Sequence, residues 1–484
     1  MSLKIYNTLT RKKELFTPVK EGHAGMYVCG VTVYDECHLG HARAYVSFDV
    51  IKRYLEYKGY KVKYVRNVTD VDDKIIDKAR KLKKADLVSA AEEVTEKYFG
   101  SFKADMSKLN ISEPDVEPRA TGHIKEIIGI VSSLIDKGYA YALDGDVYYE
   151  VAKFKDYGKL SGRSLEDMMA GARVEVNQNK RSAMDFALWK KAKEGEPYWD
   201  SPWGKGRPGW HIECSAMSTK YLGQPFDIHG GGQDLIFPHH ENEIAQSEAC
   251  FDKEFVKYWM HNGFVTINSE KMSKSLGNFF ALKDIFKKYD GNVVRFFLLT
   301  KHYRSPIDFT EEDLVEAKKN IERIENCMGR VRELAGDTGD GSKEGPAGTG
   351  AAAEFEAAMD DDFNTAKALA VVFDIVNEIN NILDSGKDID KAKGLIADLR
   401  MILNVLGMRY TAVKIEKVLF SQVKEPLDIE GILKEDDVSD AAVKDLIMMR
   451  NHARKNKEWK TADAIRDSLL KKGVTLRDEA DGTV

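Results

Sequence analysis

Apolar and polar positions follow two different periods near the start of the chain. Residues 26–29 form a short apolar run that is typical of a buried strand. Apolar side chains then recur at helical spacing, at Ala44, Phe48, Ile51 and Leu55. This pattern predicts a helix that Gly59 ends, and residues 61–68 predict a second strand in which Arg66 breaks the apolar face. The order strand, helix, strand predicts a parallel sheet with a right-handed crossover, as in nucleotide-binding folds.

The middle of the chain predicts an insertion and then a return to the same sheet. Residues 120–204 are punctuated by glycines, and residues 145–151 have the pattern of a strand. We expect the sheet to resume at residues 210–213 and again at residues 226–229. From Thr310 onward the pattern becomes helical and charged.

The last third of the chain predicts helices on either side of a flexible connection. Residues 336–346 contain four Gly and one Pro among polar residues, a composition typical of a linker. Two or three helices are expected to follow, as far as about Leu406. Residues 409–436 have little periodicity, and from Lys444 to Lys472 there are nine Lys or Arg against four acids. This excess fits nucleic acid binding and fits a solvated helix face equally well.

The composition is that of an ordinary globular protein, with 43% hydrophobic and 31% charged residues among 484. This length predicts about three domains. No apolar run is long enough to cross a bilayer and the first residues lack a secretory signal, so we expect neither membrane contact nor export. Five widely spaced cysteines argue against a disulfide framework and for a cytoplasmic location. The net charge of −6 means that nucleic acid binding would need local basic patches.

Two histidines lie between the first predicted strand and the helix, in His38-Leu39-Gly40-His41. Backbone N–H groups and the positive end of the helix dipole favour an anion at this place. Gly40 would let a nucleotide approach the backbone, and the imidazoles of His38 and His41 could donate hydrogen bonds to phosphate oxygens. Four-residue matches also arise by chance, so the alternative from these residues alone is two surface histidines beside a turn.

Two further segments have the residue types of a nucleotide site. In the run 271–275 (KMSKS), Lys271 and Lys274 lie three apart and can neutralise charge that develops on a triphosphate. In the run 230–234 (GGGQD), three glycines would admit a ligand against the backbone, and Asp234 could accept a hydrogen bond from ribose or adenine. The alternatives are a solvated basic loop and a plain tight turn.

Four scattered residues could bind a metal ion. His239 and Glu243 are i and i+4 on a predicted helix, so their side chains share one face. A metalloprotease helix is excluded, because it would need histidine at the position of Ile244. Cys29 and Cys214 offer thiolates, but buried cysteines usually pack as small hydrophobes. Because these residues have no regular spacing, the residues alone leave a metal site and a packing role both open.

The H-x-G-H and KMSKS motifs, in this order, resemble the two ATP-handling motifs of class I aminoacyl-tRNA synthetases. The surrounding residues narrow the resemblance to the cysteinyl-tRNA synthetase family, over almost the whole chain. The resemblance implies an α/β fold, with a Rossmann-type class I synthetase catalytic domain, an inserted connective domain, a helical bundle and a small C-terminal anticodon-binding domain. The expected bounds are 1–119 and 205–270 for the two catalytic halves, 120–204 for the insertion, 271–319 for the KMSKS loop and connecting fold, 320–408 for the bundle with a linker at 335–352, and 409–484 for the last domain.

By the same resemblance, the chain would activate L-cysteine with Mg²⁺-bound ATP and transfer it to the terminal ribose of tRNA(Cys). Each of the four candidate ligands falls on a zinc-binding position of the family, where zinc would bind the substrate thiolate and discriminate against serine. The implied residues are His38, His41, Lys271 and Lys274 for catalysis, the histidines with Gly40, Gly231, Asp234 and Lys274 for ATP, Gly30, Thr32 and Trp210 for cysteine, and Cys29, Cys214, His239 and Glu243 for one Zn²⁺ per chain. Without the resemblance, Trp210 could equally be a core tryptophan.

The resemblance also implies partners and leaves competing functions. Arg454, Trp459 and Asp463 fall where the family contacts anticodon bases, although Trp459 could instead be a core residue of a small domain. Cysteine:glucosaminyl-inositol ligases of mycothiol synthesis resemble the same catalytic half but lack the full C-terminal extension. A third possibility, a non-catalytic tRNA-binding paralogue, is disfavoured because both ATP motifs are intact. We expect a cytoplasmic monomer with ATP, L-cysteine and tRNA(Cys) as partners.

Overall fold

The computed structural model divides the chain into two compact units, residues 1–412 and residues 413–484. The described residues of the first unit are 2–164, 180–267, 270–271, 280–335, 350–386 and 388–409. Those of the second unit are 446–447, 450, 453–454, 459–471, 476, 478–479 and 482–483.

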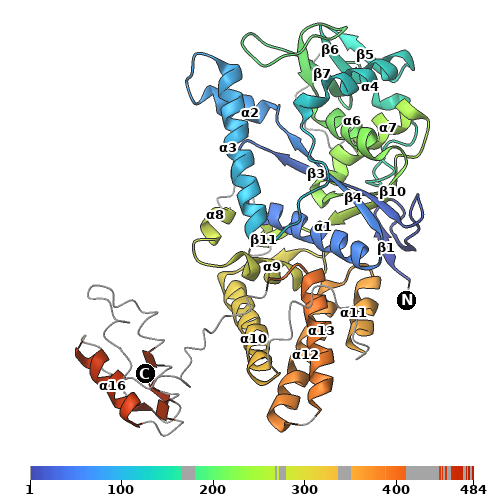
Figure 1. The fold of residues 1–484 in the computed structure, drawn as a ribbon. Helices are drawn as coiled ribbons and strands as arrows, with labels where there is room; N and C mark the ends of the chain where they lie inside the picture. The colour runs from blue at the N-terminus through green and yellow to red at the C-terminus, as the bar shows by residue number, and fades with distance from the viewer. Residues whose placement is uncertain are drawn as a thin grey trace. The chain divides into compact units, whose positions relative to one another are not determined.

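A four-stranded parallel sheet with the order β10-β9-β3-β4 lies at the centre of the first unit (Figure 1). Its strands are β3 (His23–Thr32), β4 (Lys61–Thr69), β9 (Phe226–Gly232) and β10 (Val256–Asn262). Helix α1 (Leu39–Tyr57) connects β3 to β4, so the predicted strand–helix–strand unit is confirmed. Side chains alternate across the pleat, and Met26 and Val28 of β3 join the core that contains α1. Cys29 therefore faces the other side of the sheet.

Helices α6 (Trp210–Leu222) and α7 (Glu241–Phe251) share a core with that other side. The strand expected at residues 210–213 is wrong, because these residues begin α6. Ile212 and Ala216 are both buried, and a spacing of four residues places them on one helical face. The helix ends at Gly223, which has a φ of +77°. The strand expected at residues 226–229 is confirmed as part of β9.

A second, antiparallel sheet with the order β5-β6-β7-β8 forms most of the insertion. Helix α4 packs on it through a separate apolar core that includes Ile127, Val131 and Trp189. The elements around this region are α2 (Asp73–Arg80), α3 (Leu87–Lys108), η1 (Ala120–His123), α4 (Ile124–Asp136), β5 (Ala140–Leu143), β6 (Asp146–Tyr149), η2 (Val151–Lys153), β7 (Phe186–Lys191) and β8 (Gly206–Pro208).

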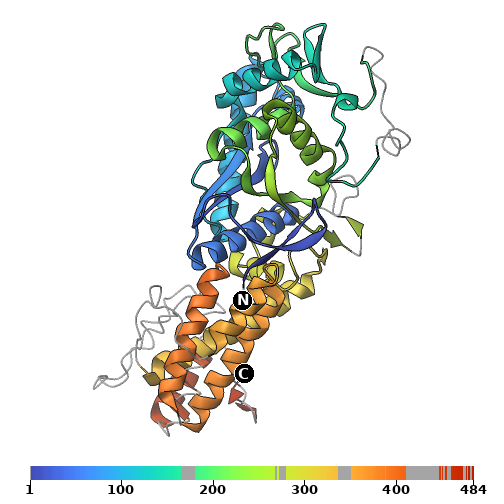
Figure 2. The ribbon, with the colours of Figure 1, turned by 90° about the vertical axis from the view of Figure 1, so that its right-hand side faces the viewer.

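A three-stranded sheet and a helical bundle complete the first unit. The elements of this sheet and the short helices beside it are β11 (Val265–Ile267), β12 (Glu270–Lys271), β13 (Ile307–Asp308), α8 (Leu282–Ile285) and α9 (Gly291–Leu299). The bundle helices, side by side in Figures 1 and 2, are α10 (Glu311–Ala335), α11 (Ala351–Asp360), α12 (Thr365–Ser385) and α13 (Ile389–Val405). The helices expected after Thr310 and as far as Leu406 are therefore confirmed, whereas most of the predicted linker lies outside the described residues.

The remaining described elements are short hairpins, two turns and one helix. A hairpin of β1 (Lys4–Asn7) and β2 (Lys12–Leu15) starts the chain, and turns η3 (Gln233–Leu235) and η4 (Ile236–His240) precede α7. In the second unit the described elements are α16 (Trp459–Lys471) and the hairpin of β14 (Asp478–Glu479) and β15 (Gly482–Thr483). Among the described helices, none is both long and apolar enough to cross a membrane.

Candidate active site and metal centre

A cleft of about 300 Å³ opens at the carboxyl ends of β3, β9 and β10. Ligands bind at this edge of parallel sheets, where the connecting loops diverge. Nine residues that were proposed from the sequence line it, namely Cys29, Gly30, Thr32, His38, Gly40, His41, Trp210, Gly231 and Asp234. The fold thus brings residues assigned to cysteine and to ATP together with one of the four metal ligands, Cys29, although they come from segments far apart in the chain.

The H-x-G-H motif forms the start of α1, and its two histidines cap that helix. His38 Nδ1 accepts a hydrogen bond from the N–H of Gly40 at 3.0 Å, and His41 Nδ1 accepts one from the N–H of His38 at 3.2 Å. The two rings stack with centroids 3.8 Å apart. Because both Nδ1 atoms accept, the proton of each neutral imidazole lies on Nε2. A hydrogen bond from either ring to an anion would therefore come from its Nε2–H.

The glycines at the end of β9 have a packing role as well as a place in the cleft. A Cβ on Gly230 would lie 2.3 Å from Phe48 Cε1, so this glycine lets α1 pack closely on the sheet. A Cβ on Gly231 would lie 2.8 Å from Leu235 Cδ1. Gly231 and Gly232 line the cleft, whereas packing against Phe48 accounts for Gly230.

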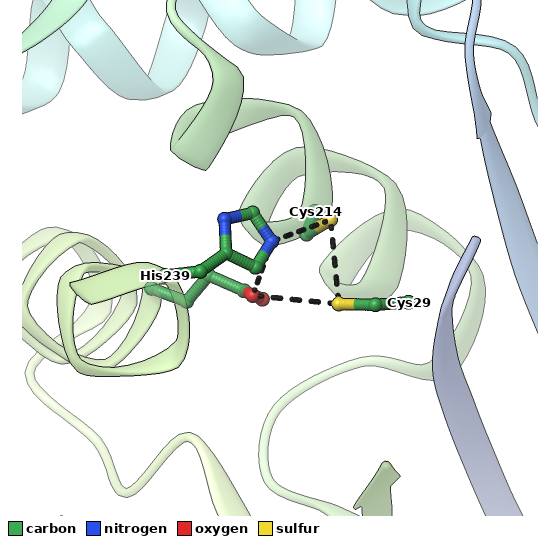
Figure 3. Close-up of side chains that lie close together, drawn as sticks. Cys29, Cys214 and His239 are labelled. Carbon is green, nitrogen blue, oxygen red and sulfur yellow. Dashed lines mark hydrogen bonds and ion pairs between the residues drawn. The ribbon is translucent and has the colours of Figure 1, made fainter. Parts of the chain in front are cut away.

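The four predicted metal ligands lie together in a buried cluster. Figure 3 shows three of them, Cys29, Cys214 and His239, with their side chains close together. The Sγ atoms of Cys29 and Cys214 are 3.9 Å apart. His239 Nε2 is 3.5 Å from Cys214 Sγ and 3.1 Å from Glu243 Oε1. Cys29 Sγ is 3.8 Å from the same carboxylate oxygen. Strand β3, helix α6 and the η4–α7 turn each contribute to this cluster, so it depends on the complete sheet.

The spacing of these donor atoms suits a zinc ion. Around tetrahedral zinc, bond lengths of about 2.0–2.3 Å separate neighbouring ligand atoms by about 3.3–3.8 Å. The four separations above are 3.1–3.9 Å. A second group, Cys29, His229, His240 and Glu243, is also close enough to share an ion. Its closest pairs are His229 Nε2 with Glu243 Oε2 at 2.8 Å and His240 Nε2 with Cys29 Sγ at 3.2 Å, which are hydrogen-bond distances, whereas His240 Nε2 lies 3.9 Å from Glu243 Oε1.

Burial disfavours the charged forms of these donors. It raises the pKa of the Cys29 and Cys214 thiols and of the Glu243 carboxyl, and it lowers the pKa of His239 well below its usual value. A divalent cation reverses this preference for the acids, because it binds the deprotonated thiolate and carboxylate. Two thiolates, one neutral imidazole and one carboxylate are a donor set that suits Zn²⁺. The residues present therefore fit the metal that the resemblance implies.

A shell of further histidines surrounds the cluster. His211 Nδ1 lies 2.9 Å from His239 Nδ1, which leaves His239 Nε2 toward Cys214 and Glu243. His240 Nδ1 lies 2.8 Å from His261 Nε2. Contacts of this kind fix the ring orientation and the tautomer of a metal-binding histidine.

Trp210 and the end of β4 complete the cysteine side of the cleft. Trp210 stacks on the His239 ring with centroids 4.1 Å apart and is 38% exposed, so it is not a core tryptophan. Gly30 N–H donates to Asn67 Oδ1 at 2.7 Å, and Thr69 Oγ1 donates to buried Glu213 at 2.8 Å. These bonds hold the strand end that carries Cys29 against β4 and α6.

The second lysine motif is only partly described. Lys274 lies within 272–279, outside the described residues, and Lys271 is described by its backbone at the end of β12. On the far side of this segment, Leu282 N–H donates to Cys37 O at 2.9 Å. One flank of the motif is thus attached directly beside the H-x-G-H turn.

The predicted tRNA contacts lie in the second unit. Trp459 begins α16 and is 57% exposed, so it is not a core residue there. Asp463 lies one turn further along and pairs with Arg466, with Oδ1 and Nη1 3.1 Å apart. The spacing places Trp459, Asp463 and Arg466 on one helix face. Arg454 is partly buried and lies before α16.

Several residues of the site were not predicted from the sequence. They include Asn67, Thr69, His211, Glu213, His229, His240 and His261. One signal was available, since five of the eleven histidines of the chain lie between positions 211 and 261. The paired contacts among them could not be found from spacing, because they join α6, β9, β10 and η4.

Comparison with known proteins gives the family. Residues 15–319 match the model of the tRNA synthetases class I (C) catalytic domain, residues 354–411 that of the DALR domain, and residues 436–483 that of the cysteinyl-tRNA ligase anticodon binding domain. A cysteine–tRNA ligase of Pelobacter propionicus is 51% identical over all of this chain and 99% of its own length. One of Geotalea uraniireducens is 52% identical with the same coverage. The chain belongs to the cysteinyl-tRNA synthetase family.

As a family member it is a class I aminoacyl-tRNA synthetase, and the fold class expected from the sequence is confirmed. A methionyl-tRNA synthetase of Mycobacterium tuberculosis bound to methionyl-adenylate aligns with a TM-score of 0.56 over 79% of this chain and 89% of its own, at 15% identity. The LeuRS of Agrobacterium radiobacter K84, in a ternary complex with tRNA and LeuAMS, aligns with a TM-score of 0.55 over 81% and 84%, at 12% identity. At these identities the likeness concerns the fold alone.

Proposed function

We propose that this synthetase joins L-cysteine to tRNA(Cys) through a cysteinyl-adenylate made from Mg²⁺-bound ATP. The observation that carries the proposal is the buried set of two thiols, an imidazole and a carboxylate, one member of which, Cys29, lines the same cleft as the H-x-G-H turn. A cysteine–tRNA ligase needs these two features together, one for the substrate sulfur and one for the nucleotide. Full-length similarity to cysteine–tRNA ligases supports the same substrate.

The metal ligands bear on the choice of amino acid. Cysteine and serine differ by one atom, and a pocket that relies on shape discriminates such isosteres by only about 10². Translation needs about 10⁴–10⁵, which corresponds to about 5.5–7 kcal/mol of differential binding. When bound, Zn²⁺ supplies a soft Lewis acid that prefers the thiolate of cysteine to the hydroxyl of serine. Cys29, Cys214, His239 and Glu243 would hold that ion, while Trp210, Gly30 and Thr32 would wall the pocket.

The nucleotide end of the cleft contributes hydrogen bonds and charge. We assign the Nε2–H groups of His38 and His41 to the phosphates, because both Nδ1 atoms are already acceptors within the helix cap. Gly40, Gly231 and Asp234 would contact the rest of the nucleotide, with Lys271 and Lys274 neutralising the developing charge. No protein nucleophile is required, because the cysteine carboxylate attacks the α-phosphate and pyrophosphate leaves. Positioning and electrostatic stabilisation then account for the rate.

The second unit favours tRNA over an amino sugar as the acceptor. An exposed indole at Trp459, with Asp463 and Arg466 on the same helix face, suits stacking and hydrogen bonding with unstacked bases. Similarity to the anticodon binding domain at residues 436–483 supports this use. A mycothiol-type ligase has no need of such a surface.

The deciding experiment is cysteine-dependent ATP–pyrophosphate exchange, followed by charging of tRNA(Cys), each with and without a zinc chelator. We expect both activities from the full chain, loss of both after chelation, and recovery when zinc is restored. Exchange with cysteine but amide formation with glucosaminyl-inositol in place of tRNA charging would contradict the proposal.

A further inference from the structure

Arg43 of α1 is a buried cation without a described counter-ion. Its side chain is 1% exposed, and burial lowers its pKa to about 10, so the guanidinium remains charged at neutral pH. Among the described residues its hydrogen bonds all go to backbone carbonyls, namely those of Leu298, Lys301 at 3.3 Å, His302 at 2.7 Å and Ser305 at 3.3 Å. A buried charge is costly unless such bonds compensate it, so this arrangement needs all of them.

These carbonyls belong to the end of α9 and the segment that follows it. The last carbonyls of a helix have no partner within the helix and form the negative end of its dipole. Arg43 therefore caps α9 and holds the 298–305 segment against the start of α1. Arg43 itself lies two residues after His41 and does not line the cleft.

The 298–305 segment also contacts another part of the cleft wall. Gly263 N–H donates to Tyr303 O at 2.8 Å, and Ile307 N–H donates to Phe264 O at 2.9 Å, where β13 pairs with β11. A Cβ on Gly263 would lie 2.4 Å from Ser305 O, so the backbone at Gly263 and the backbone at Ser305 are in close contact. Residues 262–265 line the cleft. One guanidinium thus links α1, the helix that begins at the H-x-G-H motif, to the segment that contacts residues 262–265.

We infer that Arg43 is a positioning residue for cysteine activation, which rests on the proposed function. By bonding the 298–305 segment, it fixes the Nε2–H donors of His38 and His41 relative to the wall at residues 262–265. The metal cluster is built from β3, α6 and α7, on the other side of the sheet from α1. Loss of Arg43 should therefore slow adenylate formation without weakening cysteine binding.

The test compares Arg43→Lys and Arg43→Met with Arg295→Lys. Arg295 is equally buried and joins the same two helices, but it pairs with Asp49 and bonds the carbonyls of Leu109 and Leu406, away from the 298–305 segment. Lysine keeps the charge but cannot span four carbonyls with one nitrogen.

For Arg43→Lys we expect kcat of pyrophosphate exchange to fall by about 10–100-fold, as misplacement near 1 Å can do. The KM for cysteine should change by less than about twofold, because the lost contact acts only on the transition state. Arg295→Lys should lower the melting temperature while kcat, measured well below that temperature, stays near that of the parent protein.

Hydrogen exchange supplies a readout that does not depend on activity. Amides of residues 298–309 should exchange faster in both Arg43 variants than in Arg295→Lys. If Arg43→Lys does not fold, Arg43→Met decides by the same readouts, because it removes the buried charge and keeps the stem. A parent-like kcat in the folded variant, or exchange at 298–309 no faster than in Arg295→Lys, would overturn the inference. An inactive parent protein would instead contradict the proposed function, and amide exchange would still test whether Arg43 holds the 298–305 segment in place.

Discussion

Two thiols lie 3.9 Å apart in the metal cluster, and each supplies one of its four donor atoms. We therefore expect Cys29→Ser and Cys214→Ser to lose most of the roughly one zinc per chain that the site predicts. The KM for cysteine should rise by about 10-fold or more, because the donors hold the ion that binds the sulfur, while the KM for ATP stays within about twofold. Elemental analysis and exchange kinetics measure both.

Cys250→Ser is the matched control for these variants. Cys250 is buried on α7, the helix of Glu243, but it packs in the separate core of the insertion. It should keep full zinc content and parent-like kinetics. Stoichiometric zinc in both Cys29→Ser and Cys214→Ser would contradict the assignment of the ligands.

Lys274 belongs to the motif that lies largely outside the described residues, and its role stays a prediction from the sequence. If it stabilises the charge of the activation step, Lys274→Ala should lower the rate of adenylate formation by about 10²–10³. Cysteine binding should be nearly unchanged, since the metal cluster is separate. Equal losses in rate and in cysteine affinity would indicate misfolding instead.

At the residue level, the sequence could predict what depends on local spacing. His239 and Glu243 share a helix face because they are i and i+4, and this spacing can be read directly from the sequence. Cys29 and Cys214 come close together only in the complete fold. Their grouping was therefore predicted from the family resemblance and could not be predicted from their spacing. Gly230 was expected to make room for a ligand. In the structure, its missing side chain makes room for the ring of Phe48 instead.

At the level of elements, one buried ion pair joins α1 to α9. Although burial opposes ionisation, Arg295 and Arg53 outweigh it and hold the pKa of Asp49 below its usual value. Asp49→Asn should therefore destabilise the first unit by about 3–5 kcal/mol at pH 7, as expected when one partner of a buried pair is removed. Urea unfolding followed by circular dichroism measures the difference.

The pH dependence of that difference has a definite sign. A carboxyl whose pKa is depressed by folding stabilises the protein above its unfolded pKa of about 3.9, and this stability is lost as the pH falls through the folded value. The gap between the parent and Asp49→Asn should be constant from pH 7 to about pH 5 and shrink below about pH 4. A gap that stays constant to pH 3 would show that Asp49 acts by packing and not by charge.

Helices and strands were predicted correctly where the apolar residues followed one period, and wrongly where a helical and a strand period were both present. The apolar spacing from Ala44 to Leu55 allows only a helix, and α1 has it. Residues 210–213 alternate in polarity over four positions, which suggested a strand. The helical spacing of Ile212 and Ala216 continues for longer, and it decided the structure. Arg66 disturbed the pattern of β4 because its partner, Glu117, lies far along the chain.

For the whole molecule, sequence could indicate separate parts but not where their contacts fall. The change to helical, charged sequence after Thr310 predicted the bundle correctly. It could not show that the bundle shares one apolar core with α1 and β3, because that core is assembled from residues more than 300 positions apart. The two compact units separate near residue 412, close to residue 409, where the last domain was expected to begin.

This division leads to the last prediction, that activation and charging can be separated. Every described residue that lines the cleft or the metal cluster belongs to the first unit. A chain ending at residue 412 should keep cysteine-dependent pyrophosphate exchange but charge tRNA(Cys) poorly. In the full chain, Trp459→Ala should weaken charging by about 1–3 kcal/mol, the contribution of one stacked base, without changing its dependence on salt. Leu470→Ala, another exposed apolar residue of α16, is the control and should charge normally. If the shortened chain charges tRNA as well as the full one, the second unit does not read the anticodon.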